Sequence, residues 1–116
     1  MATVNGTGSW IAPGVHKQTW TALASGDVGN ALTAPNLPDK TVHLTGTFNT
    51  ATCVIQGSND GTNYETLADP NGNALSFTAT GIETILENVQ YIRPKTGTAG
   101  GSAAITVTVV SQSAKR

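Results

Sequence analysis

Charged residues are scarce in this sequence. Asp, Glu, Lys and Arg make up 11% of its 116 residues, whereas about 25% is ordinary for a soluble domain. Six basic and seven acidic residues leave a formal net charge of −1, so the chain lacks the excess of positive charge that releases counterions from nucleic acid. We therefore expect no nucleic-acid partner and a surface built largely from Thr, Ser, Asn and Gly.

Cysteine is nearly absent as well. Cys53 is the only one, so no disulfide can form within the chain, and stability must come from packing or from assembly. A catalytic thiol would need a histidine close in space, and His16 and His43 are the only candidates. We predict instead that Cys53 is a small buried side chain in a strand. One cysteine and two widely separated histidines also offer no zinc-ligand cluster.

Long apolar runs are missing too. No stretch of 18 apolar residues exists, so we expect no membrane-spanning helix and no membrane partner. Residues 1–14 lack both the basic region and the apolar stretch of a secretory signal peptide. The expectation is a protein made in the cytoplasm and not exported by that route.

Catalytic and metal-binding patterns are equally hard to find. Asp60 and Asp69 belong to turn sequences, where local hydrogen bonding accounts for them, and Glu83 and Glu87 are typical of solvated positions. Residues 59–65 offer several oxygen ligands, but their spacing does not match a calcium-binding EF-hand loop. The glycine-rich segments lack the lysine and the helix of a phosphate loop. We therefore predict no enzyme, no catalytic residue, no cofactor and no metal.

What the chain does contain is a series of short alternating segments separated by turns. The clearest is Lys40–Phe48, in which Val42, Leu44 and Phe48 alternate with polar residues. Similar segments follow at about 8–12-residue intervals, a spacing typical of antiparallel sandwiches and barrels. We expect these further strands at 15–23, 51–56, 74–80, 89–95 and 103–109. The predicted fold is an all-β, antiparallel, jelly-roll-like β-sandwich formed by residues 15–110.

Residues 54–67 carry the strongest turn signal. Two apolar-containing arms surround Asp60-Gly61, a pair that tolerates the positive φ angles of a two-residue type I′ turn. We predict a hairpin here, and a second hairpin in which residues 40–48 and 51–56 pair around Asn49-Thr50.

Two further segments are less regular. Ile82, Ile85 and Leu86 would suit a single helical turn within Gly81–Asn88, but the surrounding strands favour an irregular strand. Pro94 has no backbone N–H, so we expect it to end its strand or to push that strand to a sheet edge.

The N-terminal segment has the composition of an arm. Residues 1–14 are small, polar and glycine-rich, with Trp10 and Ile11 as the apolar anchor. We predict an extended N-terminal arm that lies against another protein through these two side chains. Residues 111–116 form a short, polar and basic C-terminal tail.

The long segment between residues 24 and 39 is the second candidate contact surface. It is rich in Gly and Pro, and long loops of this kind are often functional. We expect Leu32 and Leu37 to plug the end of the core and, together with Pro35, to contact a partner.

Four large aromatic residues with a polar group remain. Trp10, Trp20, Tyr64 and Tyr91 could stack on sugars if they were exposed in a row. Such residues are more often core or interface anchors, and we expect Trp20 in the core.

Two stretches of the chain resemble known families. Gln56–Tyr64, with the sequence Gln-Gly-Ser-Asn-Asp-Gly-Thr-Asn-Tyr, resembles a segment of discoidin-like jelly-roll domains, which supports a β-sandwich. Thr41–Val109 resembles small structural proteins of tailed bacteriophages. That likeness lies in residues 42–48 (Val-His-Leu-Thr-Gly-Thr-Phe), the Gly-Ser-Asn-Asp-Gly turn, Tyr91-Ile92-Arg93-Pro94 and the glycine-rich turn before the last strand.

These features look like those of phage head decoration (cement) proteins. The resemblance implies a virion structural protein on the outer capsid surface, a homotrimer that binds the major capsid protein and stabilises the shell. A phage tail, neck or baseplate component is an alternative of the same kind. A carbohydrate-binding β-sandwich module is an alternative of another kind.

Overall fold

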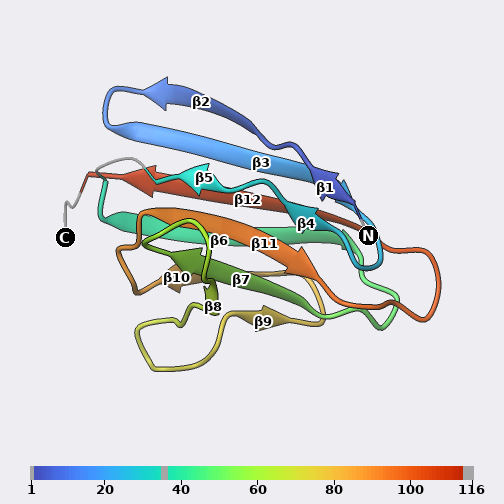
Figure 1. Ribbon diagram of the computed structural model, residues 1–116. Coiled ribbons are helices and arrows are strands. Elements are labelled where there is room, and N and C mark those ends of the chain that lie inside the picture. The colour runs from blue at the N-terminus through green and yellow to red at the C-terminus, as the bar shows by residue number, and fades with distance from the viewer. Residues whose placement is uncertain (1, 35–36, 114–116) are drawn as a thin grey trace.

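The computed structural model describes residues 2–34 and 37–113, and these form strands, turns and loops without a helix (Figure 1). The strands are β1 (Thr3–Val4), β2 (Thr7–Ala12), β3 (Val15–Leu23), β4 (Val28–Gly29), β5 (Leu32–Thr33), β6 (Asp39–Thr47), β7 (Cys53–Ser58), β8 (Glu65–Thr66), β9 (Ser76–Phe77), β10 (Gly81–Ile85), β11 (Tyr91–Thr96) and β12 (Ala104–Gln112).

The strands form two sheets that face each other (Figure 1). The long-strand sheet has the order β10-β6-β12-β3-β2, and all its pairs are antiparallel. The short-strand sheet has the order β1-β4-β11-β7-β8, with β5 paired to β11 and β9 paired to β7. Its one parallel pair among the described residues is β1 with β4. The predicted all-β sandwich is confirmed.

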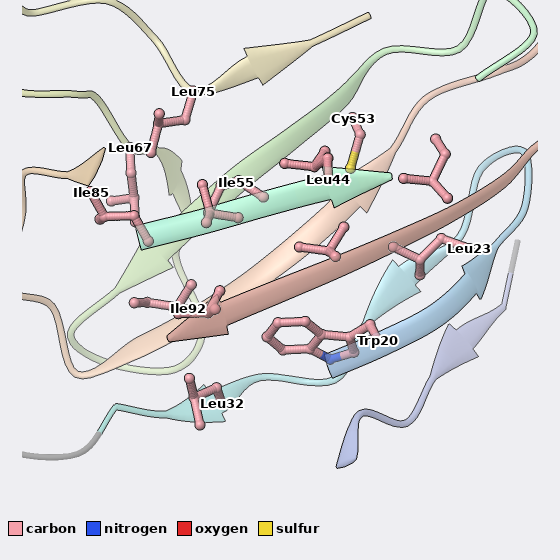
Figure 2. Packing of buried hydrophobic residues seen from close by; sticks show 14 of the residues in the cluster. Trp20, Leu23, Leu32, Leu44, Cys53, Ile55, Leu67, Leu75, Ile85 and Ile92 are labelled. Carbon is pink, nitrogen blue, oxygen red and sulfur yellow. The ribbon is translucent and has the colours of Figure 1, made fainter. Parts of the chain in front are cut away.

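The core lies between the sheets because both contribute alternating apolar side chains to it. In β6, Val42 and Leu44 point inward, and in β12 every second residue from Ile105 to Val109 does the same, all without solvent exposure. Ile55 and Ile92 face them from the short-strand sheet (Figure 2). Burying one such side chain contributes roughly 1.5–3 kcal/mol, so this shared core is the main source of stability.

Trp20 joins the two sheets. It is fully buried on β3, and its indole Nε1–H donates to the backbone oxygen of Asn30 at 2.9 Å and to its Oδ1 at 3.0 Å. Asn30 Oδ1 also accepts from Gly6 N at 2.8 Å. These bonds hold the segment before β5 against the core. Within the predicted long loop, the described residues 24–34 therefore contain two short strands, β4 and β5.

The N-terminal segment is not an arm separate from the domain. β2 pairs with β3 along its length, and β1 pairs with β4. The connection from β2 to β3 is a tight Pro13-Gly14 turn in which Gly14 has a φ of 76°, as the third position of a type II turn requires. The boundary at residue 14 is corrected, because this turn folds the segment back onto the open edge of β3.

The predicted start of the C-terminal tail at residue 111 is also corrected. β12 continues to Gln112, where it still pairs with Val15 of β3 and Asp39 of β6. Residues 114–116 lie outside the described residues.

The predicted hairpin at residues 54–67 is confirmed in its pairing and corrected in its turn. β7 and β8 pair at Gln56 with Thr66 and at Gly57 with Glu65. Residues 59–64 therefore form a longer loop in place of a two-residue turn. The carboxylate of Asp60 holds this loop by accepting from the backbone N–H groups of residues 62 and 63, both at 2.8 Å.

The second predicted hairpin is wrong. β6 belongs to the long-strand sheet and β7 to the short-strand sheet, so the chain crosses the sandwich between them. Asn49 and Thr50 both have positive φ angles, 48° and 68°, and this left-handed pair turns the chain toward the other sheet.

Gly81–Ile85 and Pro94 were the less regular positions in the sequence. Gly81–Ile85 is a strand, β10, as expected. Pro94, however, lies within β11, inside the short-strand sheet. It pairs with Ile55 of β7, but the backbone N–H and C=O of Ile55 form their hydrogen bonds on the side of β7 that faces away from β11. On the other side of β11, β4 pairs only at Lys95. Because no neighbouring strand of the described residues requires an N–H at this position, the proline interrupts no ladder.

Candidate functional site

The residues predicted to contact a partner are scattered. Trp10 and Ile11 are 60% and 57% exposed on β2. Leu32 is only 7% exposed and belongs to the core, as expected for a plug but not for a contact residue. Leu37 is half-buried, and Pro35 lies outside the described residues. The structure thus leaves the pair on β2 as the exposed part of the predicted surface.

β2 is an edge strand of unusual composition. All six of its residues are exposed, none is charged, and it lies at the end of the long-strand sheet. Proteins usually protect such edges with lysine, proline or inward-pointing charges, because an open edge can pair with another chain. The Trp10 ring lies edge-on to His16, with centroids 5.1 Å apart at 71°. The edge is therefore open, uncharged and apolar at one end.

A cleft of about 540 Å³ lies elsewhere, at one end of the sandwich. Its lining combines four apolar residues, three carboxamides and one cation, and contains no acidic residue among those described: Ala34, Leu37, Pro38, Lys40, Asn59, Asn88, Val89 and Gln90. The segments before β6 and before β11 supply most of it. The volume of this cleft lies within the range of small-ligand sites, and its lining is more polar than is usual for them.

Lys40 is the unusual member of this lining. It lies two residues before Val42 on β6, so its side chain shares the core-facing side of the strand, and it is 2% exposed. Nζ donates to Asn88 Oδ1 at 2.8 Å. Burial lowers the pKa of Lys40, while the charge of Asp39 opposes that shift. Lys40 was not among the residues predicted from the sequence, although the alternation through Val42 and Leu44 already placed it inward.

Lys40 belongs to a polar row across the long-strand sheet. It is paired with Ser111 on β12, Ser111 with His16 on β3, and His16 with Trp10 on β2. Ser111 is fully buried. Among the described residues, neither Ser111 Oγ nor His16 Nδ1 has a hydrogen-bond partner. Only strand pairing brings these residues together, so no local sequence signal could have found the row.

The large aromatic residues do not form a sugar-stacking row. Trp20 is buried, and the Arg93 guanidinium lies 3.8 Å from the centre of the Tyr64 ring. Arg93 Nε also donates to Gln56 Oε1 at 2.9 Å, which fixes the guanidinium there. The ring of Tyr91 lies beside Gly61 of the 59–64 loop. Both tyrosines therefore pack within the molecule.

The candidate calcium loop is a hydrogen-bonded turn. Besides the two backbone N–H groups, the Asp60 carboxylate accepts from Ser58 Oγ at 2.9 Å and from Asn63 Nδ2 at 2.8 Å. These donors lower the pKa of Asp60 well below its usual range. Within residues 2–34 and 37–113, no three His, Cys, Asp or Glu side chains gather closely enough to hold a metal ion.

Cys53 is buried in β7, in agreement with its predicted place in a strand. Burial raises the pKa of its thiol to about 11, despite a weak bond from Thr96 Oγ1 to Sγ at 3.9 Å. Reactive cysteines have lowered pKa values instead. The described part of the chain also contains no helix long and apolar enough to cross a membrane.

Comparisons with known proteins show similarity of fold only. No protein family and no curated protein matches this sequence. The crystal structure of YomS, a protein derived from the SPBc2 prophage, superimposes with a TM-score of 0.62 at 14% identity, over 84% of this chain and 95% of that one. BH2720 from Bacillus halodurans (TM-score 0.45, 7% identity, 96% and 72% of the two chains) and a cupin 2 domain-containing protein from Halorhodospira halophila (0.43, 8%, 97% and 67%) are more distant.

Proposed function

We propose that this chain is a structural protein of a bacteriophage particle, and specifically a capsid decoration protein. The observation that carries the proposal is the open, uncharged edge of β2 with exposed Trp10 and Ile11. It occurs on a domain whose fold matches a prophage-derived protein over most of both chains. The resemblance of Thr41–Val109 to phage decoration proteins supports the same assignment.

The proposed mechanism is the addition of buried surface, without chemistry. A strand of the partner would pair with β2 through backbone hydrogen bonds, a recurring mode of recognition at open sheet edges. Trp10 and Ile11 would supply the apolar contacts that set the position of the partner, because large apolar side chains dominate binding energy at interfaces. In this proposal the partner is the major capsid protein, the site is the outer capsid surface, and the chain acts as a homotrimer.

The low charge of the chain supports an assembly role. A protein with 11% charged residues has few of the surface charges that keep a free monomer soluble, and without an internal disulfide its stability must come from packing or assembly. Pairing β2 with another chain would cover this uncharged edge together with Trp10 and Ile11. Part of the stability of such a protein is then supplied by its neighbours.

The direct test compares phage particles assembled with and without this protein. We expect mass spectrometry to detect it in purified particles, imaging to place it on the outer shell, and shells without it to break at lower temperature or in low salt. Equal resistance of the two kinds of shell would contradict the reinforcing role. Density on the tail, neck or baseplate would replace the capsid assignment with that alternative. Sizing of the purified chain should show a trimer.

A matched pair of variants tests the β2 edge itself. Ile11→Lys introduces a charge on β2, and Ile82→Lys introduces the same charge on β10 at the other edge, where Ile82 is 60% exposed. We expect Ile11→Lys to reduce incorporation into particles at least tenfold and Ile82→Lys to leave it unchanged. Equal incorporation of both variants would show that β2 is not the contact.

A further inference from the structure

The buried lysine in the cleft forms no ion pair with the described residues. Lys40 is 2% exposed, and the neutral oxygen of Asn88 is the hydrogen-bond acceptor that this part of the chain offers its Nζ. Removing an ammonium group from water costs several kcal/mol unless a carboxylate and further hydrogen bonds compensate it. The Asn88 amide oxygen and the nearby charge of Asp39 compensate only part of that cost, since burial still lowers the pKa of Lys40.

Packing does not explain the lysine either. The positions that follow it on the same side of β6 are Val42 and Leu44, and its neighbour on β10 is Ile85, all buried and apolar. An apolar residue at position 40 would continue this pattern without burying a charge. Lys40 thus occupies a position where the fold alone would favour a residue such as Met or Leu.

A second, independent observation lies next to it. Ser111 pairs with Lys40 across β6 and β12, is fully buried, and its Oγ has no hydrogen-bond partner among the described residues. Buried polar groups are almost always satisfied, and an unsatisfied hydroxyl costs about 1–3 kcal/mol. Two incompletely satisfied polar groups therefore stand side by side at the cleft end of the long-strand sheet.

The lining determines which ligand would satisfy such a site. Lys40 contributes the positive charge, and the carboxamides of Asn59, Asn88 and Gln90 add N–H donors. Asn59 Oδ1 already accepts from Gln90 N at 2.9 Å, which leaves the NH₂ group of that amide to donate. No acidic residue of the described chain lines the cleft, and Ala34, Leu37 and Val89 form its apolar walls. The arrangement favours an anion that carries an apolar group.

We propose that this cleft binds a carboxylate borne on a short apolar group, with Lys40 Nζ as the charged anchor and the carboxamides as additional donors. The carboxylate could belong to a free organic acid or to the C-terminus of a peptide, and both present the same chemistry to the cleft. This site is separate from β2 and does not rest on the proposed role in phage particles.

The test titrates the full-length protein, followed by ¹H–¹⁵N NMR. Butyrate represents the free acid and N-acetyl-Ala-Ala-Leu the peptide terminus, while butyramide and the peptide amide are their neutral counterparts. We expect shifts at residues 37, 39, 40, 59 and 88–90 with at least one acid. Binding should be weaker by roughly 10–100-fold with its amide, since a hydrogen bond to a charged group contributes about 1.5–3 kcal/mol. Binding of one acid and not the other identifies the source.

Variants separate binding from folding. Lys40→Met removes the charge and keeps the length of the side chain, while Lys17→Met makes the same change at an exposed position of β3. We expect Lys40→Met to lose acid binding at least tenfold and to melt at the same temperature as the wild type or higher, because it no longer buries a charge. Lys17→Met should bind normally. Lys40→Gln serves as a second neutral variant if Lys40→Met does not fold.

Three results would overturn the proposal. One is the absence of shifts at the cleft with both acids at saturating concentration. Another is binding of the amides, or of inorganic phosphate, as tight as that of the acids. The third is acid binding that survives in folded Lys40→Met or Lys40→Gln.

Discussion

The two sheets share one core and are built in different ways. In the long-strand sheet, β3, β6 and β12 have nine residues each and pair almost continuously. In the short-strand sheet, five of the seven strands have two residues, and loops separate them. The long-strand sheet is held mainly by backbone hydrogen bonds between its strands. The short-strand sheet depends more on side chains that form hydrogen bonds with the backbone.

Those side chains are the carboxylates and amides of its loops. Asp27 accepts from Ala24 N at 2.9 Å, Asn30 from Gly6 N at 2.8 Å, and Asp69 from Asn71 N and Asn73 N, both at 2.9 Å. Segments held by few ladder bonds open locally at a lower free energy than long paired strands. We infer that the long-strand sheet is the stable frame and that the short-strand sheet opens first.

The largest effect should come from Trp20, where the two sheets meet. Trp20→Ala removes a fully buried indole and leaves a cavity between β3 and the segment before β5. We expect a loss of about 3–5 kcal/mol in the free energy of unfolding, which would lower the melting temperature by roughly 10–20 °C in a domain of this size. Chemical denaturation and calorimetry measure this change.

Trp20→Phe tests the comparison more sharply. It keeps a ring in the core and deletes the Nε1–H that donates to Asn30, at a cost of about 1–3 kcal/mol for the unsatisfied acceptor. Native-state hydrogen exchange should become faster in β4 and β5 and remain slow in β12. Equal acceleration throughout both sheets would show that they open as one unit and would contradict the difference inferred here.

The same division explains how much of the fold could be predicted. Val15–Leu23 has the bounds that we predicted, because a long paired strand leaves an alternation of buried and exposed residues in its own sequence. The expected strand in Gly81–Asn88 is confirmed as β10, although the surrounding strands and not an alternation of its own indicated it. The second predicted hairpin is wrong because the sequence around Asn49-Thr50 does not distinguish a turn that crosses to the other sheet from a hairpin turn within one sheet. Only contacts distant in sequence decide which sheet β7 joins.

The cleft was beyond the reach of local patterns for the same reason. Lys40 begins a strand that we predicted, and its inward side follows from Val42, yet nothing near it in sequence indicates Asn88 or Ser111. Trp10 and Ile11 were predicted contact residues and are exposed, but the Pro13-Gly14 turn that makes them part of an edge strand was not recognised. Residues far apart in the chain build both sites.

A smaller effect is expected at Cys53, inside the short-strand sheet. Its thiol has a pKa of about 11 when folded, against an ordinary value of 9.0, because burial disfavours the thiolate. The unfolded chain therefore ionises first. The stability from this thiol is complete below pH 9 and is lost as the pH rises through 9 to about 11, at roughly 1.4 kcal/mol per pH unit. Denaturation at pH 8, 9, 10 and 11 measures the decline.

Cys53→Ser is the matched control, since a serine hydroxyl does not ionise in this range. We expect its stability to fall less steeply than that of the wild type above pH 9, by about 2 kcal/mol at pH 11. Parallel curves for the two proteins would mean that the thiol ionises without unfolding. That result would indicate that β7 admits water and would support early opening of the short-strand sheet.

The smallest effect should occur at Asp60, which holds the exposed 59–64 loop beside β7 and β8. Its carboxylate accepts from the backbone N–H groups of Thr62 and Asn63, and these bonds lower its pKa below the ordinary value of about 3.8. A lowered folded pKa means that the stabilisation is complete above the unfolded pKa and is lost as the pH falls through the folded pKa. Asp60→Asn should therefore melt slightly below the wild type at pH 7, and the difference should shrink between pH 4 and pH 2.

Glu65→Gln provides the comparison, because Glu65 is an exposed carboxylate on β8 and carries no such set of backbone bonds among the described residues. We expect its melting temperature to differ little from that of the wild type at pH 7. Hydrogen exchange gives the decisive reading: Asp60→Asn should speed exchange in the 59–64 loop and at Glu65 and Thr66 while β12 stays protected. If exchange in β12 accelerated equally, opening of this exposed loop would be coupled to opening of the long-strand sheet. That result would contradict the inference that the short-strand sheet opens first.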